Sequence, residues 1–241
     1  DIFTPRQLVA LTTLADLVHE AHSKVEQDAL AAGLSADNKA LEAAGAGATA
    51  YADAVSVYLG LAASKAADNN STICSWMPGI KYEVVRNTFS RQALPMTWDY
   101  AEPNPFAESS GDFYEQVKRS LTVFEVSFPN STASGKSVQA DAQSGIDAIG
   151  RVVSTDPPYY DNIAYADLSD FFYVWLRRSL QPVFPDLFAT LAVPKTDELV
   201  ATPLRHGSKD KAEVFFLDGM TCRARVLGAS LLLTGPVWIA Y

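Results

Sequence analysis

Residues 151–160 read Arg-Val-Val-Ser-Thr-Asp-Pro-Pro-Tyr-Tyr, and this stretch decides the predicted fold. Its β-branched residues predict a buried strand, and the two prolines, Pro157 and Pro158, cannot continue the hydrogen-bond ladder of a strand. We therefore expect Asp156 to lie at the carboxyl end of this strand. In open α/β sheets, that edge is where ligands bind.

The residues that end this strand offer hydrogen-bond acceptors beside an aromatic surface. Each proline fixes its own φ angle and restricts the residue before it, so the Asp156 carboxylate and the adjacent carbonyls are held in nearly one arrangement. Carboxylates and carbonyls accept hydrogen bonds without donating any, and a tyrosine ring stacks on flat molecules. The pattern predicts a ligand with a flat ring that carries an NH₂ group, such as a nucleobase.

The tetrapeptide Asp156-Pro157-Pro158-Tyr159 resembles the Asp-Pro-Pro-Tyr motif of S-adenosylmethionine-dependent amino-methyltransferases, which methylate N6 of adenine or N4 of cytosine. The resemblance implies that these four residues form the catalytic motif. Asp156 and the Pro157 carbonyl would accept hydrogen bonds from the target amine, and Tyr159 would stack on the base. An enzyme of this type that acts on DNA must extrude its target base from the duplex.

The resemblance extends over most of residues 1–220 and points to one branch, the large bacterial and archaeal proteins described as adenine-specific DNA methylases. Those proteins carry an N-terminal domain of unknown function. The similar segments are Thr155–Arg178, Phe3–Leu8, Arg91–Met96 with Trp98 and Asp99, Asn104–Phe106, and Leu199–Pro203 with Arg205, His206 and Gly207. By this resemblance, Arg205 and His206 belong to a loop that binds the substrate.

The implied cofactor is S-adenosylmethionine, which such enzymes bind at a glycine-rich turn after the first strand. Gly45 and Gly47 are the nearest candidates, but no β-branched strand precedes them, so a small-residue linker is the favoured interpretation. Asp141 and Ala142 follow a short predicted strand and are assigned to the cofactor side; the alternative is that Asp141 caps a helix. Because the glycine-rich turn is missing, we expect the chain to be the C-terminal part of a longer catalytic unit.

The turn after the motif supplies further candidates for contacts to the substrate. Tyr160, Asp161 and Asn162 stand between the prolines and the next helical pattern, where they are placed to contact the base or the sugar. The alternative is that these residues only stabilise the turn, and we favour this role for Asn162.

The rest of the chain is predicted to be mostly helical. Apolar residues three or four apart predict helices over residues 5–32, 48–68, 113–124 and 168–180, the first entered through Thr4 and Pro5 and the last capped by Asp167. Residues 33–47 are predicted to form a loop, 69–112 an irregular segment of strands and turns packed on the sheet, and 138–140 a short strand. The predicted fold class is α/β: a partial Rossmann-like methyltransferase sheet in residues 113–241, with an added helical and irregular region in residues 1–112.

Composition and charge bear on partners and location. The 241 residues carry a net charge of −9, so contacts to a DNA partner are expected to depend mostly on a part of the parent protein outside this chain. The two cysteines do not have the spacing of metal ligands. His19 and His22 are three residues apart, which also matches no metal site, and we expect them to be solvated helix residues. No signal peptide opens the chain, and the apolar run 227–241 falls short of the roughly 20 residues that span a membrane, which predicts a cytoplasmic protein.

Two alternatives to DNA methylation remain open on these residues. In the first alternative, the chain is a catalytically inactive fragment that binds a nucleotide or a partner protein, and the missing glycine-rich turn favours this interpretation. In the second alternative, it is a methyltransferase that acts on RNA or on a protein glutamine. The motif reads a planar amine or amide, so it does not by itself select the polymer.

Overall fold

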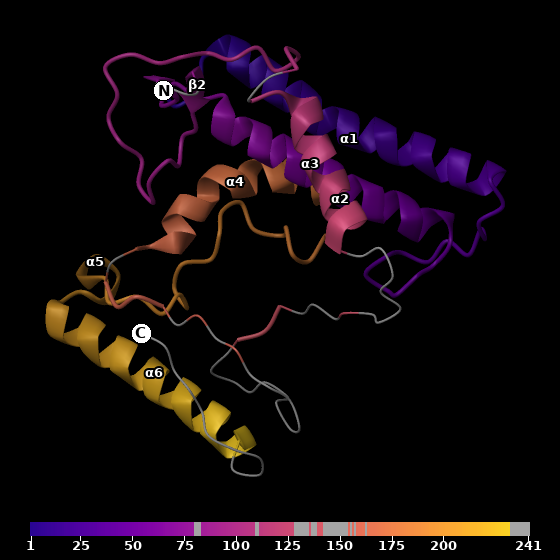
Figure 1. The fold of residues 1–241 in the computed structure, drawn as a ribbon. Helices are drawn as coiled ribbons and strands as arrows, with labels where there is room; N and C mark the ends of the chain where they lie inside the picture. Colours follow the sequence, from indigo (N-terminus) through magenta and orange to yellow (C-terminus); the bar gives the residue numbers. More distant parts are fainter. Residues whose placement is uncertain are drawn as a thin grey trace. The chain divides into compact units, whose positions relative to one another are not determined.

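Helices dominate the computed structural model, which describes residues 1–79, 83–108, 111–127, 135, 139–141, 154, 156, 158–161 and 163–231. The described elements are α1 (Pro5–Ala31), α2 (Ala48–Asn69), β1 (Ser75–Pro78), β2 (Glu83–Arg86), α3 (Phe113–Ser127), α4 (Tyr165–Leu180), α5 (Pro203–His206) and α6 (Lys209–Leu231) (Figure 1). The chain forms two compact units. The first comprises Asp1–Asn130 and Asp167–Val193, and the second comprises Ser131–Ala166 and Pro194–Tyr241.

The expected Rossmann-like α/β sheet is wrong. Within the described part of the chain, the only sheet is the antiparallel pair β1–β2, which lies in the region expected to be irregular. Ser154, Asp156 and residues 139–141 belong to no strand, and residues 138, 151–153 and 155 lie outside the described residues. β-Branched residues favour a strand only where a neighbouring strand completes the ladder, so a short β-branched run does not by itself predict a sheet.

The four helices expected from apolar spacing are confirmed. α1 begins at Pro5, and Thr4 caps it: its Oγ1 accepts from the Gln7 N–H at 3.2 Å, while Gln7 Oε1 accepts from the Thr4 N–H at 2.9 Å. This reciprocal arrangement satisfies two backbone donors that the first helical turn leaves without partners. The helix start predicted from Thr4 and Pro5 is therefore correct.

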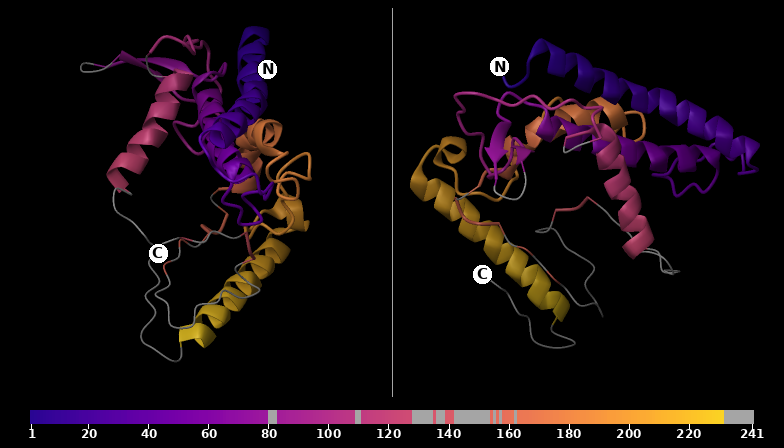
Figure 2. Two further views of the ribbon diagram at one scale, coloured as in Figure 1. Left: turned by 90° about the vertical axis from the view of Figure 1, so that its right-hand side faces the viewer. Right: turned by 45° about the horizontal axis from the view of Figure 1, so that its top comes forward.

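α1 and α2 form an antiparallel pair, which Figure 1 and both views of Figure 2 show side by side. At one end, the Thr72 N–H donates to the Ile2 carbonyl at 2.8 Å, and near the other, Thr49 Oγ1 donates to Glu26 at 2.6 Å. Alanine occupies most buried positions of α2, and its small side chain lets neighbouring elements approach closely. Alanine also has the highest helix propensity, so α2 is favoured both locally and by packing.

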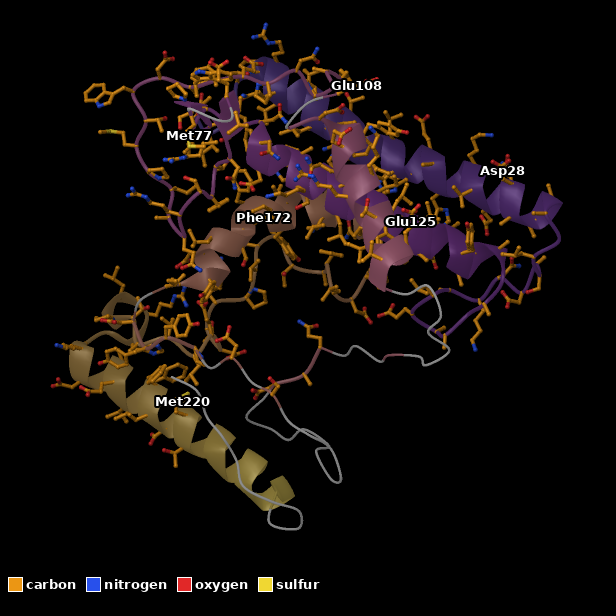
Figure 3. All side chains as sticks on the ribbon, viewed as in Figure 1. Asp28, Met77, Glu108, Glu125, Phe172 and Met220 are labelled. Carbon is orange, nitrogen blue, oxygen red and sulfur yellow. The ribbon has the colours of Figure 1, made fainter. Side chains whose placement is uncertain are left out.

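An aromatic core joins α4 to this pair. Phe171 and Trp175 of α4 are buried together with Leu11 of α1 and two alanines of α2. Phe3 contacts both aromatic residues, with ring centroids 5.4 Å from each, stacked on Phe171 and edge-on to Trp175. Figure 3 labels the neighbouring Phe172 on α4. This core brings a helix from late in the sequence against the two N-terminal helices.

The end of α2 is fixed by the buried carboxylate of Asp68. Its oxygens accept from Lys65 Nζ at 2.6 Å, from Asn87 Nδ2 at 2.8 Å and from the Phe89 N–H at 3.0 Å. Its backbone carbonyl accepts from both the N–H and the hydroxyl of Thr88, each at 2.7 Å. A buried charge is tolerated only when it is paired and hydrogen-bonded, and Asp68 is both. It thereby holds the segment after β2 against the end of α2.

The second unit has its own small core. Ala201, Ala212 and Phe216 are buried together, and Leu199, Tyr160 and Met220 pack against them; Met220 is labelled on α6 in Figure 3. Ser208 starts α6, since its Oγ accepts from the Lys211 N–H at 3.2 Å. The helix continues to Leu231 and so includes the first residues of the apolar run 227–241. Among the helices in the described residues, none combines the length and the apolar character needed to cross a membrane.

We predict that Asp68→Ala lowers the free energy of unfolding by about 1–3 kcal/mol, because it leaves the partly buried donors of Asn87 and Phe89 without an acceptor. Asp28→Ala is the matched control, since Asp28 pairs with Lys24 on the exposed face of α1 and such pairs contribute little (Figure 3). Urea denaturation followed by tryptophan fluorescence measures both. Equal losses for the two variants would contradict the role given to Asp68.

Candidate functional site

Part of the predicted motif lines a surface pocket of about 330 Å³ in the second unit. Asp156, Pro158 and Tyr159 contribute to its wall, as three of the four motif residues, and Pro157 lies outside the described residues. Tyr160, Tyr165 and Glu198 complete the polar and aromatic part of the lining. The pocket thus combines two carboxylates with three phenol rings.

A hydrogen bond joins the two ends of the motif. The Tyr159 hydroxyl donates to Asp156 Oδ1 at 3.2 Å. This bond, followed by the negative charge of Asp156, raises the pKa of Tyr159 above that of an ordinary tyrosine. Both side chains are exposed, so a ligand reaches them from solvent without a structural change.

Tyr160 is held rigidly beside the motif. Its φ is +41°, a left-handed value that costs a residue with a side chain free energy and persists only when surrounding contacts enforce it. Here its carbonyl accepts from the Ala201 N–H at 2.9 Å, and its ring meets Phe216 edge-on with centroids 5.2 Å apart. Tyr160, predicted to contact the substrate, therefore also anchors the pocket to the core of the second unit.

Glu198 is a pocket residue that the sequence analysis missed. Its Oε1 accepts from the Ala166 N–H at 2.8 Å, and its Oε2 accepts from Arg205 Nη1 at 2.6 Å. Arg205 Nη1 also donates to the Lys195 carbonyl at 3.2 Å. No sequence signal identified Glu198, because its partners lie seven and 32 residues away along the chain.

The same contact explains where α4 begins. Asp167 was expected to cap a helix starting at residue 168, but α4 starts at Tyr165 and Asp167 lies in its first turn. A carboxylate distant in sequence, that of Glu198, accepts from the N–H of Ala166 in this turn. An acidic side chain there also interacts favourably with the helix dipole, as do Arg177 and Arg178 in the last turn.

Arg205 and His206, predicted to contact the substrate, lie on α5 and not in the described lining of the pocket. Arg205 acts on the pocket through Glu198, whose carboxylate it holds. The His206 ring stacks on Phe215 with centroids 4.2 Å apart. Gly207 ends α5 with a φ of +81°, a left-handed conformation that favours glycine. The contribution of α5 is to position the pocket wall.

The structure does not bring the other predicted residues into the described lining. Asp161 is exposed in the turn after Tyr160, and Asp141 is exposed outside any helix or strand. Ala142 and Asn162 lie outside the described residues. The assignment of Asp141 and Ala142 to a cofactor site stays a prediction.

Gly45 and Gly47 do not form a cofactor cradle. A Cβ atom on Gly45 would lie 1.9 Å from the Lys39 carbonyl oxygen, and one on Gly47 would lie 2.4 Å from Asp37 Oδ1. The space beside each glycine is filled by the α1–α2 loop itself, so these residues leave no room for the methionine part of S-adenosylmethionine. Among the described side chains, no group of three or more histidine, cysteine, aspartate or glutamate residues is placed to bind a metal ion.

The raised pKa of Tyr159 can be measured directly. We predict that ¹³Cζ-tyrosine NMR will show Tyr159 ionising above the ordinary value of about 10 and returning toward it in Asp156→Ala. The hydrogen bond requires the protonated phenol, so its contribution is complete below the ordinary pKa and is lost as the pH rises through the raised one. Tyr159→Phe assigns the resonance, and an unchanged pKa in Asp156→Ala would contradict the contact.

Glu198→Ala should loosen the start of α4 and lower stability by about 1–3 kcal/mol, because it removes an acceptor from Ala166 and a partner from the largely buried Arg205. Glu213→Ala, at an exposed position of α6, is the control. Thermal unfolding measures the loss, and hydrogen exchange at the Ala166 amide localises it. Protection at Ala166 that is unchanged in Glu198→Ala would rule out this role.

Comparisons of the chain with models of protein families, with curated proteins and with solved structures found no match. The interpretation of this pocket therefore depends on its own residues: a carboxylate tied to a tyrosine hydroxyl, two further phenol rings, and the glutamate that fixes the surrounding wall.

Proposed function

We propose that the Asp156 pocket holds the exocyclic amine of a nucleobase for S-adenosylmethionine-dependent methylation, with N6 of adenine in DNA as the first candidate target. The observation that carries this proposal is the joint placement of Asp156, Pro158 and Tyr159 in one pocket wall, with the carboxylate and the phenol hydrogen-bonded. The resemblance of Asp156–Tyr159 to the Asp-Pro-Pro-Tyr motif agrees with that chemistry. The proposed location is the cytoplasm, as expected from the sequence.

The Asp156 carboxylate suits an amine because it offers acceptors only. One oxygen, Oδ1, already accepts from the Tyr159 hydroxyl, which orients the group, and the carboxylate is exposed to an incoming N–H. Accepting from the amine withdraws its lone pair from the ring and stabilises the positive charge that develops during methyl transfer. Asp156 and Tyr159 would therefore position the nucleophile and need not remove a proton before the bond forms.

The rest of the wall suits a flat ring. Besides the three tyrosines, Ile163, Leu199 and Val200 give the pocket an apolar part, and about 330 Å³ lies in the range of small-molecule sites. Stacking on a tyrosine stabilises a base without selecting its sequence context. A base within a duplex reaches such a pocket only when it is extruded.

The proposed cofactor supplies an electrophilic methyl group when it is bound. The loop around Gly45 and Gly47 is filled by its own atoms, so these two glycines offer no room for it. The part of the reaction assigned to this chain is to bind and orient the amine. Contacts to DNA would come largely from elsewhere in a longer protein, as expected for a chain with a net charge of −9.

A nucleotide-binding module without turnover is the second candidate function. The filled space beside Gly45 and Gly47 favours it, because a pocket that binds a base without a cofactor site would recognise nucleotides and not modify them. The two candidates share base binding and differ in methyl transfer. They are therefore separated by adding the cofactor and DNA after binding has been measured.

We predict that the chain binds adenosine about ten- to a hundredfold more tightly than purine riboside, which lacks the amine, because a hydrogen bond to a charged acceptor contributes about 1.5–3 kcal/mol. Asp156→Asn should remove this preference. Asp218→Asn changes the charge equally at an exposed position of α6 and should keep it. Calorimetry measures all six combinations of the three proteins and the two ligands.

Equal affinity for the two nucleosides, or a preference that survives in Asp156→Asn, would contradict amine recognition by this pocket. If recognition holds, transfer of a radioactive methyl group from S-adenosylmethionine to DNA distinguishes the two candidate functions. Transfer that is lost in Asp156→Asn supports the methyltransferase, and specific binding without transfer supports the nucleotide-binding module.

A further inference from the structure

A second cavity, of about 360 Å³, lies in the first unit, where α1, α2 and the end of α4 meet. Its polar lining includes His19 and His22 of α1, Asp53 and Ser56 of α2, and Ser179 of α4. The two histidines, expected from the sequence to be solvated helix residues, are partly buried and participate in hydrogen bonds that join α1 to other elements. The cavity shares no described lining residue with the Asp156 pocket.

Each oxygen of the Asp53 carboxylate already has a donor from the protein. Its Oδ1 lies 2.9 Å from His22 Nε2, and its Oδ2 accepts from the Leu41 N–H at 2.9 Å. His19 Nε2 lies 2.9 Å from the Arg178 carbonyl oxygen, so it acts there as the donor. Both rings are thus held through Nε2, and in the neutral imidazole form each Nδ1 is an acceptor. The geometry provides fixed acceptors beside a carboxylate whose two oxygens each have a protein donor.

Two serine hydroxyls in the lining are buried without a protein partner. Ser56 and Ser179 are each 1% exposed, and neither Oγ makes a hydrogen bond to the protein. A buried hydroxyl without a partner costs free energy, and two of them in the wall of one cavity call for an explanation. A ligand with hydroxyl groups would satisfy both, since each hydroxyl donates one hydrogen bond and accepts others.

We infer that this cavity binds a small neutral polyhydroxy compound, a monosaccharide or a cyclic polyol. No lysine or arginine is in the described lining to pair with an anion, and the Asp53 oxygens are already engaged, which disfavours a cation. No phenylalanine, tyrosine or tryptophan in that lining offers a stacking surface to an aromatic ring. Val18, Pro182 and Val183 supply the apolar contacts that the C–H face of such a compound makes.

This inference is independent of the proposed methylation. The residues that carry it belong to the unit formed by Asp1–Asn130 and Asp167–Val193, whereas the Asp156 pocket belongs to the other unit. Loss of base binding in Asp156 variants leaves it unaffected.

The three histidines of the chain provide the assay. D-Ribose, D-glucose and myo-inositol are titrated into the whole chain carrying ¹⁵N- and ¹³C-labelled histidine, and the ring resonances are followed by NMR. We expect at least one of these compounds to shift the His19 and His22 signals in a saturable manner. The His206 signal, from the other unit, should stay unchanged and serves as the internal reference.

Serine variants test the assignment of the ligand contacts. Ser56→Ala and Ser179→Ala should each weaken binding about five- to tenfold, because each loses one hydrogen bond. Without ligand, both variants should be at least as thermally stable as the unmodified chain, since each removes a buried unpaired hydroxyl. Ser120→Ala on α3 is the matched control and should bind normally, because the Ser120 hydroxyl donates to Gln116 and lies outside the cavity lining.

Four outcomes overturn the inference. The first is the absence of any His19 or His22 shift with all three compounds at tens of millimolar. The second is a His206 shift of the same size, which indicates non-specific binding. The third is unchanged affinity in both serine variants. Equal or tighter binding of glucose 6-phosphate would also overturn the assignment of a neutral ligand.

Discussion

The carboxylate of Glu198 is the contact on which the candidate site depends. With one oxygen it accepts from the first turn of α4, and with the other it holds Arg205 of α5, so a single side chain joins three segments around the Asp156 pocket. Both partners of the ion pair are largely buried, which makes the interaction less screened than a surface pair. The wall that faces Asp156 and Tyr159 is fixed by this contact and by the packing of Tyr160 on Phe216.

In the first unit, buried carboxylates also join segments that are distant along the chain. Asp68 binds the segment after β2 to the end of α2, and Asp53 binds His22 of α1 to α2. Apolar packing of alanines alone tolerates a shift of one helix along the other, whereas a buried carboxylate satisfied by donors from several elements does not. The contact between Asp53 and His22 therefore fixes the register of α1 against α2, and the aromatic core buries apolar side chains of α1, α2 and α4 together.

The sequence predicted local structure well and long-range pairing poorly. Helix spacing and the Thr4-Pro5 start identified α1 to α4, because these signals lie within one or two turns of the residues they govern. The strand before Asp156 was inferred from β-branched residues and from a family resemblance, but the described part of the chain holds helices and one short hairpin and no Rossmann-like sheet. A strand depends on partners far along the chain, and its own residues do not reveal whether they exist.

By itself, the sequence determined where the N-terminal helices begin and which chemistry Asp156, Pro158 and Tyr159 offer, because capping, helix periodicity and functional groups are properties of neighbouring residues. Only the tertiary structure placed Glu198 beside these residues and made its carboxylate an acceptor for the first turn of α4. It also buried two serines in the wall of a cavity with His22 and Asp53. Each of these arrangements joins residues distant along the chain. Their proximity comes from packing, which no local pattern encodes.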